Sequence, residues 1–130
     1  MAPQMVRLLA ATLVLAALVA AALTLRGADA APPPTRARDG RIAIALDDFR
    51  FDPQVIRARR GSLTLELHNR GRLGHGFRLR KNGRMWITVP TLRPGERRTI
   101  TRRLEAGDYR MFDALSNYEE LGMYGTVVVR

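Results

Sequence analysis

The sequence contains no cysteine in its 130 residues, and it has only two histidines. Without cysteine the chain can form neither disulfides nor a thiolate metal site, so a folded domain must be stabilised by packing. Three catalytic motifs are also absent: the Gly-x-Ser-x-Gly elbow, the His-Glu-x-x-His pair and the Gly-x-x-x-x-Gly-Lys-Ser/Thr phosphate loop. We therefore expect a protein that is not an enzyme.

The first 30 residues have the pattern of an export segment. They begin with the short basic stretch MAPQMVR, continue with an apolar run over residues 8–25, and end with the small residues of Ala28-Asp29-Ala30. This order predicts a signal peptide cleaved after Ala30. The run is just long enough to cross a bilayer, so an N-terminal membrane anchor helix is the alternative. In both cases we expect the rest of the chain to be exported across the cytoplasmic membrane, to the periplasm, the cell surface or the medium.

Basic residues outnumber acidic ones by 22 to 12, which gives a net charge of +10, and Lys81 is the only lysine. Cleavage after Ala30 leaves +9. A basic exported domain is attracted to anionic surfaces, so an anionic surface or an acidic protein is the expected partner, with membrane association through residues 8–25 if they are retained. No aromatic-rich strand accompanies the arginines, and we therefore expect no nucleic acid partner. We expect the protein to be a monomer.

Residues 31–40, APPPTRARDG, are rich in proline and charge and predict an extended linker. After the linker every strong pattern has a period of two, which is typical of half-buried strands. Turn signals separate these short runs, and no helical stripe follows residue 30, so we expect an antiparallel β-sandwich or barrel over residues 41–130. The clearest alternating positions are Ile42, Ile44, Leu46, Leu63, Leu65 and Leu67, and the clearest turn signals are Asp52-Pro53, Arg60-Gly61, Asn82-Gly83, Pro94-Gly95 and Ala106-Gly107.

Four motifs in this part of the chain resemble, in their order, those of the cupredoxin family. They are DFRFDPQVIRARRGSLTLELHN ending at Asn69, then His75, then LRPGERRTITRRLEAGDYRMF, and finally GMYGTVVV. The resemblance covers nearly all of residues 41–130 and implies an all-β fold, the Greek-key β-sandwich. Many members of this family carry one copper ion for electron transfer. The sequence is most similar to small bacterial single-domain cupredoxins and to cupredoxin-like domains found with iron-uptake proteins.

The same resemblance implies a candidate metal site at His75, Asp113, Tyr118 and Met123. His75 stands at the position of the family's first histidine ligand, and it shares strand parity with Phe77 and Leu79, so we expect it to point into the sandwich. Met123 stands at the position of the axial methionine. The cysteine position is occupied by Asp113, and the second histidine position by Tyr118. A blue copper centre depends on a short bond to a cysteine sulfur, so we do not expect a blue-copper electron carrier.

Two roles are open for this degenerate site. In the first, no metal is bound: Asp113 accepts a hydrogen bond from His75 and favours its charged form, Tyr118 donates to another acceptor, and the domain is a binding or structural module. In the second, His75, Asp113 and Tyr118 bind Cu(II) or Fe(III) in a metal-handling protein, with Met123 as a weak ligand. Side chains that converge on one point favour the metal, whereas side chains that close onto His75 favour the module.

Overall fold

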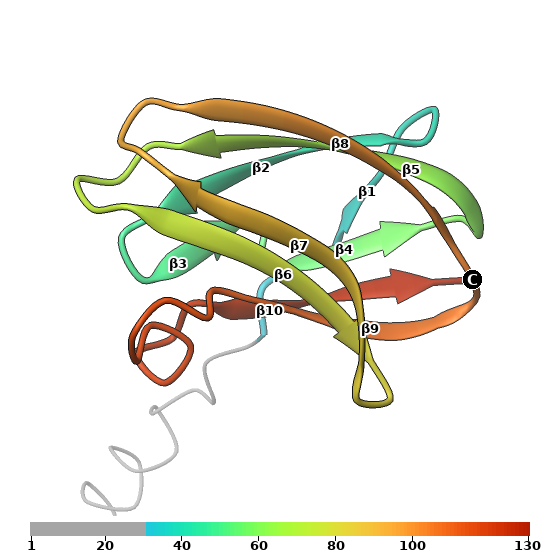
Figure 1. The fold of residues 1–130 in the computed structure, drawn as a ribbon. Coiled ribbons are helices and arrows are strands. Elements are labelled where there is room, and N and C mark those ends of the chain that lie inside the picture. Colours follow the sequence, from blue (N-terminus) through green and yellow to red (C-terminus); the bar gives the residue numbers. More distant parts are fainter. Residues whose placement is uncertain (1–30) are drawn as a thin grey trace, which may run out of the picture. The chain divides into compact units, whose positions relative to one another are not determined.

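A computed structural model describes residues 31–130. The predicted signal peptide or anchor helix at residues 1–30 lies outside the described residues. Within residues 31–130 we find no helix of the length and apolar character needed to cross a membrane. These residues form the strands shown in Figure 1: β1 (Thr35–Arg36), β2 (Arg41–Asp47), β3 (Arg50–Asp52), β4 (Val55–Ala58), β5 (Gly61–Asn69), β6 (His75–Lys81), β7 (Arg84–Leu92), β8 (Arg97–Leu104), β9 (Gly107–Phe112) and β10 (Tyr124–Val129).

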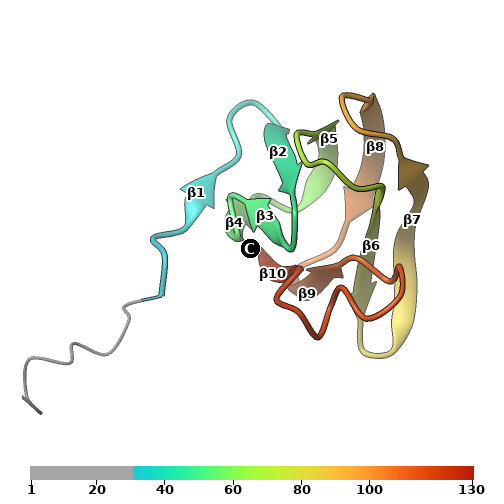
Figure 2. The same cartoon turned by 90° about the vertical axis from the view of Figure 1, so that its left-hand side faces the viewer.

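The strands form two sheets. One has six strands in the order β1-β4-β10-β9-β6-β7, and the other has four in the order β3-β2-β5-β8. Pairing is mostly antiparallel, with β2 parallel to β5 and β4 parallel to both β1 and β10. The two sheets face each other in Figures 1 and 2. The all-β Greek-key β-sandwich expected from the sequence is confirmed.

The alternating apolar residues of the sequence fill the space between the sheets. In β2 the even-numbered positions from Ile42 to Leu46 are buried, and in β5 the odd-numbered positions from Leu63 to Leu67 are buried. Phe51 packs edge-on against Phe77, with 5.6 Å between the ring centroids. Because the side chains of a strand point to opposite faces in turn, the period of two places one face in the core and the other in solvent.

The turns fall where the turn signals predict them. Asn82 and Gly83 both have positive φ angles, of 49° and 73°, and they join β6 to β7 as a two-residue hairpin loop. This is the conformation that Asn-Gly adopts most readily between antiparallel strands. The predicted linker at residues 31–40 is not wholly outside the sheets, because Thr35 and Arg36 pair with β4 as β1.

Two loops and a turn meet at one end of the sandwich, which faces the viewer in Figure 2. The loops are residues 70–74, between β5 and β6, and residues 113–123, between β9 and β10; the turn is residues 48–49, between β2 and β3. The long segment 113–123 crosses this end in both views. Every candidate site residue lies within or beside these three segments.

Candidate functional site

His75 is the first residue of β6 and is completely buried. It shares its strand face with Phe77 and Leu79, which are also completely buried. The sequence prediction that His75 points into the sandwich is therefore confirmed. A buried imidazole must satisfy two ring nitrogens without water, so its neighbours decide its chemistry.

Both ring nitrogens of His75 face a carboxylate. The distance from Nδ1 to Asp113 Oδ2 is 3.0 Å, and the distance from Nε2 to Asp48 Oδ1 is 2.9 Å. The two carboxylates contact different nitrogens of one ring, so they bracket it instead of meeting at a common point. The imidazolium form, which has a donor on each nitrogen, satisfies both carboxylates at once.

Asp48 belongs to the turn between β2 and β3, and it ties loop 70–74 to that turn. Its carboxylate accepts the backbone N–H of Arg72 at 3.1 Å and that of Leu73 at 3.2 Å. The hydrogen bond to His75 lowers the pKa of Asp48 below its ordinary value, and the Arg72 and Leu73 amides lower it further. Asp48 is therefore ionised at neutral pH.

Gly71 allows the close approach of Asp48 to His75. A Cβ atom at position 71 would overlap Asp48 Oδ1 and would lie 3.0 Å from His75 Nε2. Asn69 holds loop 70–74 against the end of β7, because its side-chain amide donates to the carbonyls of Leu73 and Leu92, at 2.8 and 2.9 Å. Asn69 at the end of β5 and Gly71 in the loop that follows therefore both maintain the geometry around His75.

Asp113 is completely buried, at the point where β9 ends. Its Oδ1 accepts the backbone N–H of Leu115 at 2.9 Å, while its Oδ2 faces His75. Its own backbone N–H donates to the carbonyl of Met123 at 3.1 Å. Asp113 therefore closes the base of loop 113–123 and joins this loop to His75.

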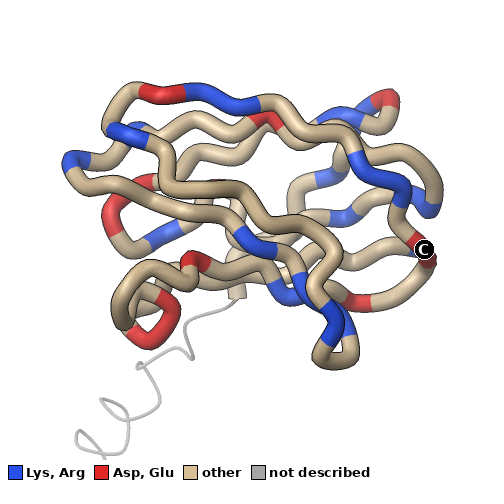
Figure 3. The backbone as a smooth tube through the Cα atoms, viewed as in Figure 1, with Lys and Arg blue, Asp and Glu red and all other residues tan. Residues whose placement is uncertain are grey.

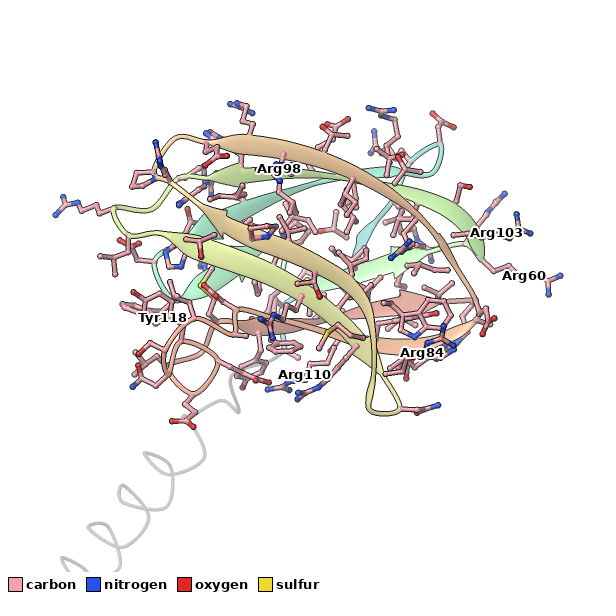
Figure 4. The ribbon with its side chains drawn as sticks, viewed as in Figure 1. Arg60, Arg84, Arg98, Arg103, Arg110 and Tyr118 are labelled. Carbon is pink, nitrogen blue, oxygen red and sulfur yellow. The ribbon has the colours of Figure 1, made fainter. Side chains whose placement is uncertain are left out.

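Tyr118 lies against the face of the imidazole. Figure 4 shows it at the end of the sandwich opposite Arg60 and Arg103. Its ring centroid is 5.4 Å from that of His75 and 5.2 Å from that of Phe49. Phe49 has a φ of 65°, which is uncommon for a bulky residue, and its ring is edge-on to Tyr118. Among the described residues no partner accepts a hydrogen bond from the Tyr118 hydroxyl, so its contact with His75 is ring packing.

Met123 is completely buried and belongs to the hydrophobic core cluster. Its backbone N–H donates to the carbonyl of Tyr118 at 3.0 Å. The structure thus brings His75, Asp113 and Tyr118 into contact and ties Met123 to them through the backbone. In residues 31–130 no group of three histidine, aspartate or glutamate side chains is arranged to hold a metal ion. The assignment of these four residues as metal ligands stays a prediction.

Sequence reasoning missed Asp48, which is the second carboxylate on His75. Its signal was present: an acidic pair, Asp47-Asp48, ends an alternating strand and stands just before the Phe-x-Pro motif. A carboxylate at the end of β2 lies near the start of β6 only once the two sheets have packed, and that contact spans 27 positions in the sequence. Periodicity gives the face of a residue but not its partner across the sandwich.

The donor set does not fit a type 1 copper centre. Such a centre needs a soft thiolate and two imidazoles, and here the corresponding side chains are a carboxylate, a phenol and one imidazole. That imidazole already has a carboxylate at each nitrogen. Asp113 stands where the thiolate would be, and Asp113 and Asp48 together occupy both ring nitrogens of His75.

A two-sheet Greek-key sandwich with a histidine opening β6 and a long loop before its last strand defines the class of cupredoxin-like proteins. The sequence profile of the cupredoxin-like domain matches residues 10–129, and the chain belongs to this family. A comparison with curated proteins gave no match.

Solved structures with the same fold include two auracyanins. The reduced auracyanin from Roseiflexus castenholzii has a TM-score of 0.65 at 16% identity, and the match covers 72% of this chain and 99% of that one. Auracyanin A, described as a "blue" copper protein from Chloroflexus aurantiacus, has a TM-score of 0.60 at 16% identity, with 75% and 100% covered. A Cu-containing nitrite reductase from Thermus scotoductus matches at 0.58 and 17% identity over 75% of this chain, but over only 28% of its own. At these identities the likeness shows the fold.

Proposed function

We propose that this protein is an exported cupredoxin-like module that does not transfer electrons and whose former ligand site is a hydrogen-bonded plug. The observation that supports it is the double engagement of His75, by Asp113 at 3.0 Å and by Asp48 at 2.9 Å. A metal ion would have to displace a carboxylate from a ring nitrogen. At Nδ1 that displacement would leave the completely buried Asp113 without its partner, which is costly.

The plug joins segments that are distant in the sequence. Asp48 comes from the turn between the first long strands, His75 from the start of β6, and Asp113 from the end of β9. Buried networks of this kind fix the relative positions of loops when every member is satisfied. The role that we assign to the site is therefore to hold one rigid end of the domain.

The rigid end has apolar surface with which a partner could pack. Leu73, Leu115 and Leu121 are exposed, and all three lie in the two loops that close over His75. Exposed apolar surface that gathers at one end of a domain is a feature of protein docking sites. This supports a binding module over a purely structural one.

A second candidate is metal handling, with Cu(II) or Fe(III) bound by His75, Asp113 and Tyr118. The contact of Tyr118 with His75, at 5.4 Å between ring centroids, favours it, because imidazole, carboxylate and phenol lie together. These ligand types suit harder ions than the thiolate site does. The metal would need to remove the phenol proton and the Asp113 contact together.

Metal titration of the untagged full chain separates the two candidates. With Cu(II) or Fe(III) added in a calorimeter, the plug predicts no stoichiometric binding that depends on His75. His68, the only other histidine, is the matched control, because it lies on β5 on the face opposite the buried leucines. Binding of one metal per chain at micromolar or lower concentration, lost in His75→Ala and kept in His68→Ala, overturns the plug and establishes the second candidate.

A further inference from the structure

At the end of the sandwich away from His75, four arginines surround a hollow. It has a volume of about 380 Å³ and lies beside β1, β4 and the end of β10. Its lining combines small apolar side chains with long basic ones. The lining residues are Arg36, Ala37, Arg57, Ala58, Arg59, Val128 and Arg130, which we call the arginine groove.

The sheet register brings the arginines together. Arg36 of β1 stands directly opposite Arg57 of β4, and the next residue across the sheet from Arg57 is Val128 of β10. Neighbouring strands are about 4.8 Å apart, so two guanidinium side chains start from adjacent positions on the same face. Like charges directly opposite each other destabilise a sheet, so this pair favours a bound anion that would offset the repulsion.

The charges of the groove are mostly uncompensated. Among the described residues no carboxylate lies within salt-bridge distance of Arg36, Arg57 or Arg59. Arg130 differs, because its guanidinium lies 2.8 Å from Asp108 at an exposed pair. Figure 3 shows basic segments on β4, and both basic and acidic segments around the end of the chain. Elsewhere arginines such as Arg70 and Arg110 are paired with acidic side chains.

We propose that the arginine groove binds a phosphate group. The guanidinium group presents its donors in a planar fork that matches two phosphate oxygens, and several arginines can contact one phosphate from different sides. The hollow is within the size range of small-ligand sites. Two sources supply this chemistry: a free phosphate compound, or the headgroup of an anionic phospholipid.

The segment between the apolar run and the groove is short, which is compatible with a lipid headgroup as the ligand. Arg36 is eleven residues beyond Leu25, where the apolar run ends. An extended segment of this length spans at most about 40 Å, so in a chain that retains residues 1–30 as an anchor the linker is short enough for the groove to reach the headgroups. Anionic lipids attract an arginine at the surface by about 1 kcal/mol, which is a factor of about five in binding.

The proposal is independent of the plug at His75. β10 begins beside that site at Tyr124 and ends beside the groove at Val129, a span of about 17 Å at the rise of an extended strand. Substitutions in the groove therefore leave Asp48, His75 and Asp113 in place. Failure of either proposal has no bearing on the other.

The test uses the full chain in mild detergent, with two double variants of equal net charge. The variant Arg36→Gln with Arg57→Gln removes the opposed pair. The control, Arg97→Gln with Arg103→Gln, removes two exposed arginines of β8 outside the groove. In the first arm the thermal midpoint is measured in sodium phosphate and in sodium chloride of matched ionic strength, because a ligand that binds the folded state raises it. We expect phosphate to stabilise the wild type and the control but not the groove variant.

The second arm compares partitioning into vesicles of phosphatidylcholine alone and with added phosphatidylglycerol. We expect the preference for phosphatidylglycerol to fall about tenfold or more in the groove variant and much less in the control. If the groove variant differs from the control only in vesicle binding, the ligand is the lipid headgroup. If it also differs in stabilisation by phosphate, a free phosphate is sufficient. Equal losses in the two variants, or no loss in either, overturn the proposal, because the response would then come from net charge or be absent.

Discussion

Asp48 Oδ1 lies 2.9 Å from His75 Nε2, on the side of the imidazole ring away from Asp113. The same carboxylate accepts two backbone amides of loop 70–74. One side chain thus determines both the position of the loop and the availability of a ring nitrogen. This relationship joins the β2–β3 turn, loop 70–74 and His75 in one hydrogen-bonded network.

Replacing Asp48 by asparagine should loosen loop 70–74. The amide keeps one acceptor but loses the charge that strengthens the hydrogen bonds from Arg72, Leu73 and His75. We expect a lower thermal midpoint and faster hydrogen exchange at the Arg72 and Leu73 amides. Asp108→Asn, at an exposed pair with Arg130, is the matched control and should leave both measurements unchanged.

A second variant tests the same contact without a change of charge. Gly71→Ala places a methyl group where Asp48 Oδ1 now lies, so it should separate Asp48 from His75. Its exchange pattern should match that of Asp48→Asn. If the amides of the loop stay as protected as in the wild type in both variants, Asp48 does not hold the loop.

Restoring the missing ligands should recreate a copper site. Asp113→Cys with Tyr118→His supplies the thiolate and the second imidazole at the two positions where the family has them, beside His75 and Met123. The first change also frees His75 Nδ1, while Asp48 keeps Nε2 and orients the ring as an outer-shell partner. We expect Cu(II) to give this variant an intense visible thiolate absorption.

Two controls make this experiment specific. Asp113→Cys alone should bind Cu(II) more weakly, because one imidazole is still missing. Adding Asp48→Asn to the double variant should weaken copper binding by about tenfold or more through loss of the outer-shell carboxylate. A double variant that folds but stays colourless with copper would show that the loop no longer has the geometry of a ligand loop.

The fold was largely predictable from the sequence, whereas the site was only partly so. The alternation of Leu63, Leu65 and Leu67 is a local property that burial enforces, and the structure follows it. The parity of His75 with Phe77 also predicted its burial. The approach of Asp48 was not predictable, because it depends on how two sheets pack and on a glycine at position 71.

Tyr118 shows the same limit in another way. Its position in the loop was predicted by resemblance, and we expected its hydroxyl to donate a hydrogen bond in the metal-free site. The structure instead packs its ring against His75 and Phe49. The hydrogen-bonded and the ring-packed arrangements of Tyr118 differ only in the rotation of its side chain, and the spacing of residues in the sequence does not determine that rotation.

The glycine that follows Tyr124 should be intolerant of any side chain. A Cβ at Gly125 would overlap the backbone carbonyl of Gln54 and the terminal methyl of Met111. Because a backbone atom cannot move aside cheaply, we expect Gly125→Ala to lower the free energy of unfolding by about 3 kcal/mol, measured by urea denaturation. Gly76→Ala is the graded control: its nearest neighbour is Asp113 Oδ1 at 3.3 Å, and its cost should be below about 1 kcal/mol. Equal costs for the two variants would contradict the steric argument.

Acid should destabilise the domain through Asp47, the last residue of β2. The hydrogen bond from Arg70 lowers the pKa of Asp47, with further contributions from the charges of Arg70 and Arg50. A group with a lowered pKa in the folded state stabilises the fold fully above its unfolded pKa, which for aspartate is about 3.9, and this contribution is lost as the pH falls through the lower folded value. Stability should therefore decline as the pH is lowered below about 4.

Arg70→Gln removes the main cause of this shift and should flatten the decline. With the pKa of Asp47 closer to its ordinary value, folded and unfolded chains bind protons more equally, so less stability is lost on acidification. Urea midpoints measured between pH 6 and pH 2, values chosen to bracket the ordinary pKa of about 3.9, give the two slopes. Arg60→Gln is the control, because Arg60 is exposed and has no acidic partner among residues 31–130.

Some loss of stability with falling pH should remain in Arg70→Gln, because two other carboxylates have lowered pKa values. The hydrogen bond to His75 lowers the pKa of Asp48, and the backbone amide of Arg93 lowers that of Glu96. If Arg70→Gln and Arg60→Gln lose stability in parallel with the wild type, the Asp47–Arg70 pair does not contribute to the acid response.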